Sequence, residues 1–597
     1  MSRLTAEEAQ LLSEVSAERV WAHAEALARW EKVSGTPGEL AAVDYIQAQL
    51  EACGLKTTRY EFESLLGWPE SAGAEIRSPE RRPMRAITHG LVPSTPEEGL
   101  EAEAVYLGAG READFRGSEV AGKLVITEGM PSPLKVLLAQ EHGAAGLIGI
   151  QEEHIHELCV SPVWGTPTTK TARNLARIPV ISIGRADGEY LKGLLKAGPV
   201  RVWVRARTFW GWRKTPIVVG ELAGSVEPEK FVLFSGHHCS WYFGAMDNGA
   251  ANATMLEVGR VLGAHRGHLR RSVRIAFWPG HTQGRYSGST WYADNFWEEI
   301  YDHCVLHVNA DSTGARGAEI YHALCMPETR EFALGVIRDA IGREAYAERM
   351  PRAGDQSFWG HGVPSIFMSL SLVPPELAAE RGQSQLFTAA GEAGPVRGGL
   401  PWFWHTAEDT IDKLDPEVLV RDTKVYLLAV WRAAVEPVLP LRYGETAREL
   451  KETVEAYQAA AGGAFDLGPV VDRVRRLEGL VAEVDRLAER VRVEGTSEEA
   501  VRAVNAGLVG LGRALVPVYF TAAGPFDHDL AVPVPPVPLL EPVRRLRELR
   551  PDSDEARFLK TELVRNRNKV MFFLRQAIET AGRTIAAVRE VSGDQAD

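Results

Sequence analysis

The stretch Phe231–Asn248 (FVLFSGHHCSWYFGAMDN) combines a signal for the fold with a signal for a site. Its apolar start, residues 231–234, predicts a short buried strand. A Ser-Gly pair ends this strand, which puts His237 at its carboxyl end, and Asp247 follows in a glycine-containing loop. Strand ends in α/β sheets often carry sites, because rigid strands aim loop side chains into one crevice. Imidazole nitrogen and carboxylate oxygen both bind zinc-like divalent cations, so the stretch indicates a metal site.

Further apolar segments around this stretch predict more strands, which alternate with helices. The expected strands are Val273–Trp278, Val305–Asn309 and Ser365–Leu370, and a helix is expected at Ala250–Leu262. Alternation of this kind is typical of an α/β fold. We therefore expect a mostly parallel, mixed sheet that is flanked by helices on both faces.

Metal-ligand residue types follow several of these strands. His281 comes shortly after the strand Val273–Trp278, and Asp311 comes shortly after Val305–Asn309. His405 lies further along the chain, in the segment Trp-Phe-Trp-His-Thr. Because parallel strands bring their carboxyl ends to one edge of a sheet, these side chains are expected to meet His237 and Asp247 there.

Composition limits the class of protein. The chain has 597 residues, which is enough for about three to five domains. Its apolar content of 45% and charged content of 25% are ordinary for a soluble globular protein. The net charge of −13 argues against a nucleic-acid partner, which would favour a basic surface. The 5 cysteines show no CxxC spacing, so neither a zinc ribbon nor a disulfide framework is indicated.

The N-terminal segment reads as one amphipathic helix with acidic residues throughout, rather than as a signal peptide. We see no apolar run of about 18 residues, so a membrane-spanning helix is not expected. These observations predict a cytoplasmic protein with neither a membrane nor a nucleic acid as its partner.

Changes in amino-acid composition and apolar pattern divide the chain into four parts. Residues 1–65 combine helices with a first strand, and residues 66–212 consist of short β-type runs with Gly and Pro between them. Residues 213–445 form the α/β region, and residues 446–597 are helical and charged. In the last part, residues 469–493 carry an apolar seam at helical spacing, and a long helix is expected from Asp554 to about Glu590. The helical part could close on itself or pair with a second copy.

The part 66–212 contains a glycine-lysine turn before a strand, a helix, the run GAAGLIGI, the run IPVISI and an Asp-Gly pair before a helix. In this order the signatures resemble a protease-associated domain, a β-rich insert found in one class of metallopeptidases. The resemblance implies that this part forms a wall of the substrate cavity and carries no chemistry of its own.

The segments GHHCSWYFGAMDNGAAN, AFWPGHTQGRYSGSTWYADN, VNADSTG and FWHTAEDTIDKLD resemble the metal-site motifs of the co-catalytic zinc peptidases. That family includes bacterial aminopeptidases, glutamate carboxypeptidase II and the transferrin receptor. The segment around residues 513–528 is similar to the dimerisation domain of the carboxypeptidase and receptor branch. Residues 1–65 and 213–445 would then form the peptidase-like domain, and the resemblance implies a homodimer through the C-terminal helices.

The resemblance also implies roles for individual residues. His237, Asp247 and Asp311 would hold a first metal ion, and Asp247 would bridge to a second ion held with His405. The ions would be divalent, with zinc favoured over manganese or iron. The substrate would be a small molecule or a short peptide-like compound.

The chain departs from the family pattern at the second strand end. The family has two adjacent glutamates where this chain has His281 and Thr282. The first glutamate is the family's general base, and the second is a ligand of the second ion. Cys239 stands where the family has an aspartate that orients the first histidine ligand, and a thiol does this poorly.

These departures leave the role of His281 open. It could act as a general base near neutral pH, serve as a metal ligand, or be a relic with neither role. One ion is expected, and a second would be weakly held or absent because Thr282 is a poor substitute for glutamate.

Three functions remain open. The first is a metal-dependent hydrolase that cuts an amide or related bond in a small, non-standard substrate. The second is a non-catalytic dimer that acts as a receptor or scaffold, although the retained ligands argue against it. The third is a mononuclear metalloenzyme of changed reaction class, with lyase or redox chemistry.

Overall fold

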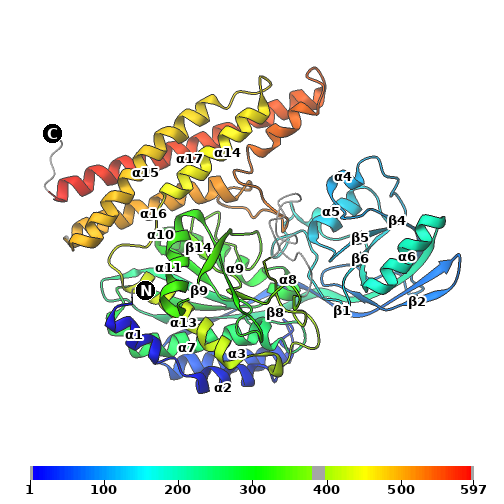
Figure 1. Ribbon diagram of the computed structural model, residues 1–597, viewed down its shortest axis with the longest axis horizontal. Coiled ribbons are helices and arrows are strands. Elements are labelled where there is room, and N and C mark those ends of the chain that lie inside the picture. Colours follow the sequence, from blue (N-terminus) through cyan, green and yellow to red (C-terminus); the bar gives the residue numbers. More distant parts are fainter. Residues whose placement is uncertain (1–3, 379–396, 496, 593–597) are drawn as a thin grey trace.

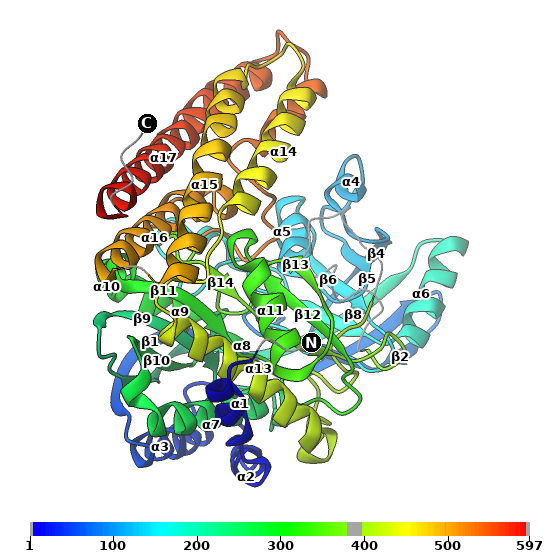
Figure 2. The same cartoon turned by 60° about the vertical axis from the view of Figure 1, so that its left-hand side comes forward.

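The structure is a computed structural model that describes residues 4–378, 397–495 and 497–592. An α/β region lies at the centre of the molecule, with a β-rich insert to one side and a group of long helices above both (Figure 1). After the molecule is turned, the long helices still lie against one side of the α/β region (Figure 2). The predicted limits of the four parts stay predictions, and one strand crosses the limit at residue 65, as described below.

The N-terminal segment forms separate helices where the sequence predicts a single one. They are α1 (Ala6–Ser13) and α2 (Ala17–Leu27), and α3 (Pro37–Ala52) follows after a break. Ser16 lies between the first two helices in an extended conformation, and its side chain accepts a hydrogen bond from the Arg19 amide at 3.2 Å. The predicted single helix is therefore wrong, because Ser16 caps a new helix instead of continuing the first one.

Three parallel strands form the centre of the sheet. They are β9 (Glu227–His237), β10 (Arg271–Trp278) and β11 (Cys304–Asn309), with β9 between the other two. Trp278 pairs with His237 and Asn309 pairs with Ser235, so the carboxyl ends of all three strands lie at one edge. The predicted strands at residues 231–234, 273–278 and 305–309 are thus confirmed, although β9 and β10 begin earlier than expected.

Of the predicted strand Ser365–Leu370, only the first two residues form a strand, and a second short strand begins just after its predicted end. β14 (Ser365–Ile366) lies parallel to β11, whereas β15 (Ser371–Leu372) pairs with β12 (Ile320–Cys325). Phe367 has a φ of 63°, in the left-handed region, which turns the chain after β14.

Helices flank the sheet as predicted. The main ones are α7 (Ala251–Ala264), α11 (Arg330–Ile341) and α13 (Pro416–Val435), and α7 packs against β9 and α13. Residues on one side of these helices join the strands in a continuous apolar core. The expected α/β architecture is confirmed.

A long pair of antiparallel strands joins the sheet to the β-rich insert. β1 (Lys56–Ser78) pairs with β8 (Arg201–Leu222) along nearly its whole length, and β8 also pairs with β10. The insert continues with six shorter strands and the helices between them: β2 (Arg82–Met84), β3 (Ala86–Thr88), β4 (Leu100–Tyr106), β5 (Leu124–Glu128), β6 (Gly146–Ile150) and β7 (Val180–Ile183). The first strand was expected only at residues 56–62, and it extends much further into the insert.

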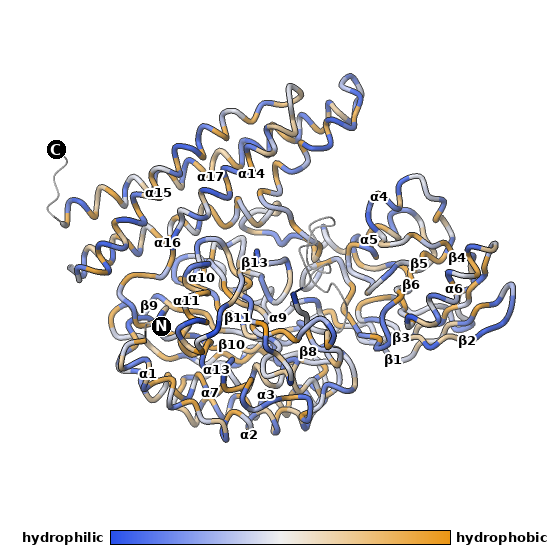
Figure 3. The backbone as a smooth tube through the Cα atoms, in the orientation of Figure 1, coloured by the Kyte–Doolittle hydropathy of each residue, from blue (hydrophilic) through white to orange (hydrophobic). Residues whose placement is uncertain are grey.

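The C-terminal part is helical, with α14 (Gly444–Ala461), α15 (Gly468–Glu494), α16 (Glu498–Phe520) and α17 (Asp554–Ser592). The predicted apolar seam of α15 is buried, including Val474, Leu477 and Val484. Hydrophobic and hydrophilic segments alternate along these helices, as amphipathic helices require (Figure 3). By length and composition α16 could cross a membrane, yet 78% of its most apolar window is buried inside the molecule.

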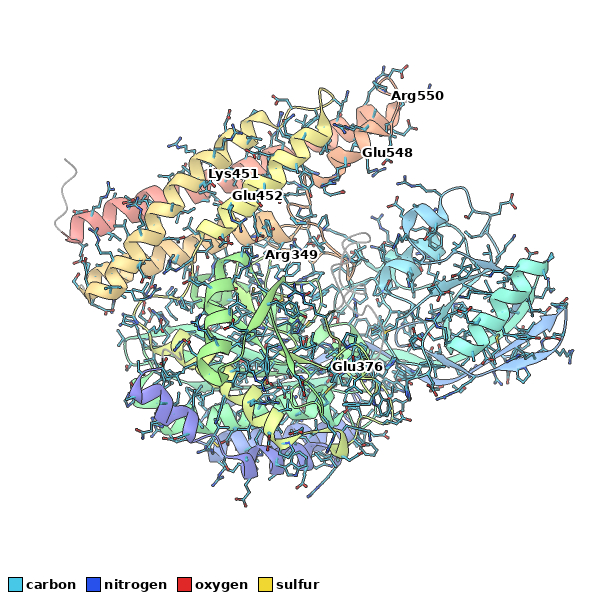
Figure 4. The ribbon with its side chains drawn as sticks, viewed as in Figure 1. Arg349, Glu376, Lys451, Glu452, Glu548 and Arg550 are labelled. Carbon is cyan, nitrogen blue, oxygen red and sulfur yellow. The ribbon has the colours of Figure 1, made fainter. Side chains whose placement is uncertain are left out.

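Ionic and cation–π contacts attach the C-terminal part to the rest. Arg349 lies below the long helices, where its guanidinium covers the Phe520 ring at 4.5 Å and donates to the Val534 carbonyl at 2.9 Å (Figure 4). Near the far end of these helices, Glu548 forms an ion pair at 3.3 Å with Arg116 of the insert. The helical part therefore contacts both of the other parts.

Candidate metal centre

The site residues arise from three neighbouring strand ends. His237 is the last residue of β9, and Asp311 comes two residues after the end of β11. His281 begins the short helix α8 (His281–Gly284), after a turn in which Gly280 has a φ of 64°. A glycine suits this turn because the left-handed region is strained for other residues. Parallel pairing of β9 with β10 and β11 therefore brings these side chains to one edge.

Asp247 lies between two histidines. Its Oδ1 is 3.1 Å from Nε2 of His237, and its Oδ2 is 3.0 Å from Nε2 of His405. Asp311 approaches the same histidine, with its Oδ1 3.5 Å from Nε2 of His237. The structure thus brings together the predicted residues His237, Asp247, Asp311 and His405, with Asp247 in the position of a bridge.

Backbone carbonyls orient both of these histidines. Nδ1 of His237 donates to the carbonyl of Cys239 at 2.8 Å, and Nδ1 of His405 donates to the carbonyl of Glu157 at 2.7 Å. Since a carbonyl only accepts, each Nδ1 carries a proton, and each Nε2 faces Asp247. The Cys239 thiol is 3.9 Å from Nδ1 of His237, so the orienting group at this residue is its backbone oxygen.

A buried carboxylate holds the backbone of Asp247. Asp409 accepts hydrogen bonds from the amide of Asp247 at 3.0 Å and from the amide of Met246 at 2.8 Å. Burial raises the pKa of Asp409 to about 7, against the lowering effect of these two hydrogen bonds. From the sequence alone, Asp409 has no assigned role. Its position four residues after His405 is the only sequence feature that could have suggested one.

His281 has its own acidic partner. Its Nδ1 is 2.7 Å from Oδ2 of Asp355, a fully buried residue that also accepts from the Ser289 hydroxyl at 2.8 Å. The ring of His281 stacks on that of His237, with centroids 3.8 Å apart. One ligand atom each of His237, His281 and Asp311 lies within 4.8 Å of the others. His281 therefore belongs to the same cluster, with its Nε2 free of the Asp355 contact.

Two departures from the family pattern contact each other. The Cys239 thiol donates to Oγ1 of Thr282 at 3.5 Å, and the Thr282 amide donates to the sulfur at 3.5 Å. Both residues are buried. Cys239 and Thr282, which stand where the resemblance implies two carboxylates, thus contact each other.

Electrostatics favour a cation among the carboxylates. Burial lowers the pKa of His237, but Asp311 and Asp247 outweigh burial and raise this pKa well above its ordinary value. Burial raises the pKa of Asp247, yet His237 and His405 hold it below its usual range. The site therefore stabilises positive charge beside Asp247.

The residues fit a divalent metal ion. Nε2 of His237 and Oδ1 of Asp247 are buried and form no hydrogen bond with any residue that the structure describes. Buried polar atoms normally have partners, so this pair is explained by a ligand between them. Nitrogen and carboxylate donors suit zinc. Asp247, His281, Asp311 and His405 line a small cavity of about 50 Å³, together with Arg285, Tyr286 and Trp404.

Comparison with known families gives two matches. Residues 218–430 match the profile of Peptidase family M28, and residues 87–191 match that of the PA domain. The second match covers the part predicted from its signatures to be a protease-associated domain.

Curated relatives include carboxypeptidases and aminopeptidases. Probable glutamate carboxypeptidase VP8 of Zea mays is 22% identical over 545 residues, which cover 80% of this chain and 75% of that protein. Aminopeptidase NAALADL1 of Rattus norvegicus is 25% identical over 360 residues, which cover 54% of this chain and 46% of that protein.

Solved structures share the fold. The aminopeptidase from Aneurinibacillus sp. strain AM-1 aligns with a TM-score of 0.54 and 20% identity, over 72% of this chain and 96% of that chain. The peptidase M28 precursor from Shewanella amazonensis SB2B aligns with a TM-score of 0.56 and 21% identity, over 73% of this chain and 97% of that chain. The predicted fold class is confirmed.

Proposed function

Since the chain carries a peptidase family M28 domain with a PA-domain insert, we propose that it hydrolyses an amide or related bond of a small substrate at a bound metal ion. The observation that carries the proposal is the carboxylate of Asp247, which lies 3.1 Å from His237 and 3.0 Å from His405.

His237, Asp247 and Asp311 would hold one zinc-like ion, and His405 with Asp247 would hold a second. When bound, the ion supplies the acidity that lets water attack a carbonyl carbon near neutral pH. The second position lacks the family's glutamate, and Oγ1 of Thr282 accepts from the Cys239 thiol instead of facing a ligand. We propose that one ion is held firmly.

His281 is proposed as the general base. Its Nδ1 is held by Asp355 at 2.7 Å, which leaves Nε2 to take a proton from the attacking water and to return it to the leaving nitrogen. Asp355 fixes the ring and stabilises the imidazolium that forms, and Ser289 holds Asp355 in turn. The arrangement supports His281 as the general base, the role that the resemblance assigns to a glutamate.

The 4.8 Å cluster of ligand atoms supports a second reading, in which His281 is itself a metal ligand. Metal content per chain, measured in wild type and in His281→Gln, distinguishes the two. As a base, His281→Gln keeps the wild-type metal content and loses about 100-fold to 10,000-fold in turnover. Loss of the ion together with activity assigns His281 to the ligand set.

The same measurements test the hydrolase proposal itself. Metal-loaded protein should hydrolyse small amides while showing negligible activity on standard aminoacyl-anilides, because both family glutamates are replaced. Protein that binds no metal under any loading condition would support the receptor or scaffold alternative. Firm metal binding without hydrolysis of any amide in a broad panel would support lyase or redox chemistry.

We also propose a cytoplasmic homodimer that pairs through the C-terminal helices. On α17 the side chains of Phe558, Val564 and Phe572 are 71%, 40% and 48% exposed, which supports an apolar contact at this helix. Sedimentation of the wild type and of Phe558→Ser/Phe572→Ser tests this. A dimer that persists in the double variant, or a monomeric wild type, removes the proposal.

A further inference from the structure

His322 lies between a serine and a glutamate. Its Nε2 is 3.1 Å from Oγ of Ser369, and its Nδ1 is 3.1 Å from Oε2 of Glu348. In the neutral imidazole, Nδ1 therefore donates to the carboxylate, and Nε2 accepts from the Ser369 hydroxyl. A hydroxyl, an imidazole and a carboxylate in this order activate a serine as a nucleophile, and the arrangement recurs on unrelated folds.

The backbone of the sheet holds these three residues together. His322 is in β12, and Glu348 is in β13 (Ala345–Arg349), which pairs with β12 in parallel. Ser369 lies between β14 and β15, and its backbone forms a bridge with that of Asp311. The carbonyl of the residue after Ser369 accepts from the amide of His322 at 3.1 Å. Side chains placed by paired strands in this way keep a precise geometry.

The serine of this group lies at the metal cavity. Ser369 lines the cavity together with Asp311 and His281. Ser369 and His322 are 6% and 4% exposed, so their hydrogen bond lies in a medium of low dielectric, where it is stronger than in water. Arg285 lines the same cavity and is also 6% exposed. A buried cation in this cavity would stabilise the oxyanion that forms when a serine attacks a carbonyl carbon.

A second serine of the cavity has a different partner. Ser312 also lines the cavity, but its hydroxyl donates to Oδ1 of Asp311 at 3.0 Å. Its partner is thus a proposed metal ligand, whereas the partner of Ser369 is a histidine that a carboxylate supports. The contacts therefore single out Ser369 as the nucleophile of this cavity.

We propose that Ser369, His322 and Glu348 form a second catalytic group, which hydrolyses small esters without a metal ion. Oγ of Ser369 forms a bond to the acyl carbon while Nε2 of His322 takes the hydroxyl proton. The bond from this carbon to the alcohol oxygen then breaks, and the alcohol leaves with that proton. Water attacks the acyl-serine and gives a proton to His322, which returns it to Oγ as the acid is released. Glu348 is a positioning residue that orients the ring and stabilises the imidazolium.

Methanesulfonyl fluoride tests the nucleophile, because it is small and transfers its sulfonyl group to an activated serine with loss of fluoride. The whole chain is treated in metal-loaded and in chelator-treated form, and peptide mass spectrometry locates the modified residue. Hydrolysis of p-nitrophenyl acetate is measured before and after treatment. We expect modification of Ser369 in both forms and loss of ester hydrolysis in the chelator-treated form. An unmodified Ser369 in chelator-treated wild type, or modification of Ser312 instead, would overturn the proposal.

Variants test the base. Ser369→Ala should abolish the modification at this position, and His322→Gln should slow it by about 100-fold or more, the usual contribution of a general base. Ser13→Ala, at an exposed position of α1, is the matched control and should behave as wild type. Circular dichroism checks the fold of each variant. Modification of Ser369 at the wild-type rate in correctly folded His322→Gln would also overturn the proposal.

Glu348 is tested by rescue with a shorter carboxylate. Glu348→Gln should lower the rate of modification at saturating reagent and leave the half-saturating concentration unchanged, because Glu348 supports His322 and does not contact the reagent. Glu348→Asp keeps the charge and should regain part of the rate. A purely structural role would not favour aspartate over the closer isostere glutamine. Equal rates in wild type and Glu348→Gln would remove Glu348 from the catalytic group.

This proposal and the proposed function fail separately, because the serine group needs neither the ion nor His281. Modification of Ser369 with ester hydrolysis, in protein that binds no metal and hydrolyses no amide, would leave the serine group standing and remove the metal-dependent function. Metal-dependent amide hydrolysis in protein whose Ser369 stays unmodified would do the reverse.

Discussion

The two halves of the metal site are built in different ways. On the β9 and β11 side, His237, Asp247 and Asp311 have the residue types of the family pattern, and a buried carboxylate and a backbone carbonyl support them. On the β10 side, His281 and Thr282 replace both family glutamates, and Arg285 brings a buried positive charge. Under the proposed function, the first half would hold an ion, whereas the second would act on a bound substrate. Ion binding and proton transfer can therefore change independently within one fold.

The largest expected effect comes from the first half. Asp247→Ala removes the carboxylate that faces both His237 and His405, and we expect loss of the bound ion with activity falling below detection. Metal analysis and a turnover assay check this. Asp412→Asn changes an exposed carboxylate near the site and should leave both quantities unchanged. Full metal content in Asp247→Ala would show that the β9 half does not hold the ion.

In the second half, Asp355→Asn tests whether His281 depends on its acidic partner. Asparagine keeps the size of Asp355 but cannot stabilise an imidazolium, so we expect kcat to fall by roughly 100-fold with metal content and KM unchanged. Steady-state kinetics with metal analysis measures this, and Ser289→Ala, which removes one hydrogen bond to Asp355 and leaves its carboxylate in place, should lose less. Equal loss of metal and activity would place His281 in the ion-binding half.

Thr282→Glu tests whether the second half of the site fails to hold a metal ion because it lacks one carboxylate ligand. A carboxylate here restores the residue type that the family uses for its second ion, so metal content should rise from about one toward two ions per chain. The rise should be greater with Cys239→Ser, because the smaller hydroxyl leaves more room for the longer side chain. Unchanged stoichiometry in both variants would mean that the second position is lost for other reasons.

The smallest expected effect is on the pH dependence of stability, and it comes from Glu39, a buried carboxylate next to His238 on the β9 side of the site. Glu39 accepts from the Thr215 hydroxyl at 2.7 Å and lies 3.6 Å from Nε2 of His238. Burial raises the pKa of Glu39 to about 7. The folded state therefore binds a proton more tightly than the unfolded chain does, and stability falls as pH rises from about 4.5 to about 7.

Glu39→Gln should remove this part of the pH dependence, which amounts to at most about 3 kcal/mol for a shift of this size. Denaturant unfolding of chelator-treated protein at pH 5 and pH 7 measures it. Glu61→Gln, at an exposed position of β1, serves as the control. An identical pH slope in wild type and Glu39→Gln would contradict the expectation.

Much of the fold was predictable because its signals are local. Short apolar runs predicted β9, β10 and β11, and parallel pairing then required His237, His281 and Asp311 to meet. The full length of β1 was not predictable, because its outer part contains Gly and Pro and is held by pairing with β8, which is distant in the sequence.

The support around the site was harder to predict. The carbonyl of Cys239 orients His237, and every residue has such a carbonyl, so the residue type carries no signal for it. Asp355 reaches His281 across 74 residues of sequence, a pairing that depends on tertiary structure. The cation of Arg285 is conspicuous only once its burial is known, together with the lack of an ion-pair partner among the described residues.

The insert was expected to have no part in the chemistry, but the carbonyl of Glu157 orients His405 from the insert side of the cavity. Gly165, from the same segment, donates to the carbonyl of Arg285. His405 and Arg285 thus both form hydrogen bonds with the backbone of the insert, whereas His237 is the last residue of β9 in the sheet. The insert and the sheet together therefore position the residues of the metal site. We expect that replacing either one with the corresponding part of a relative would change the geometry of that site.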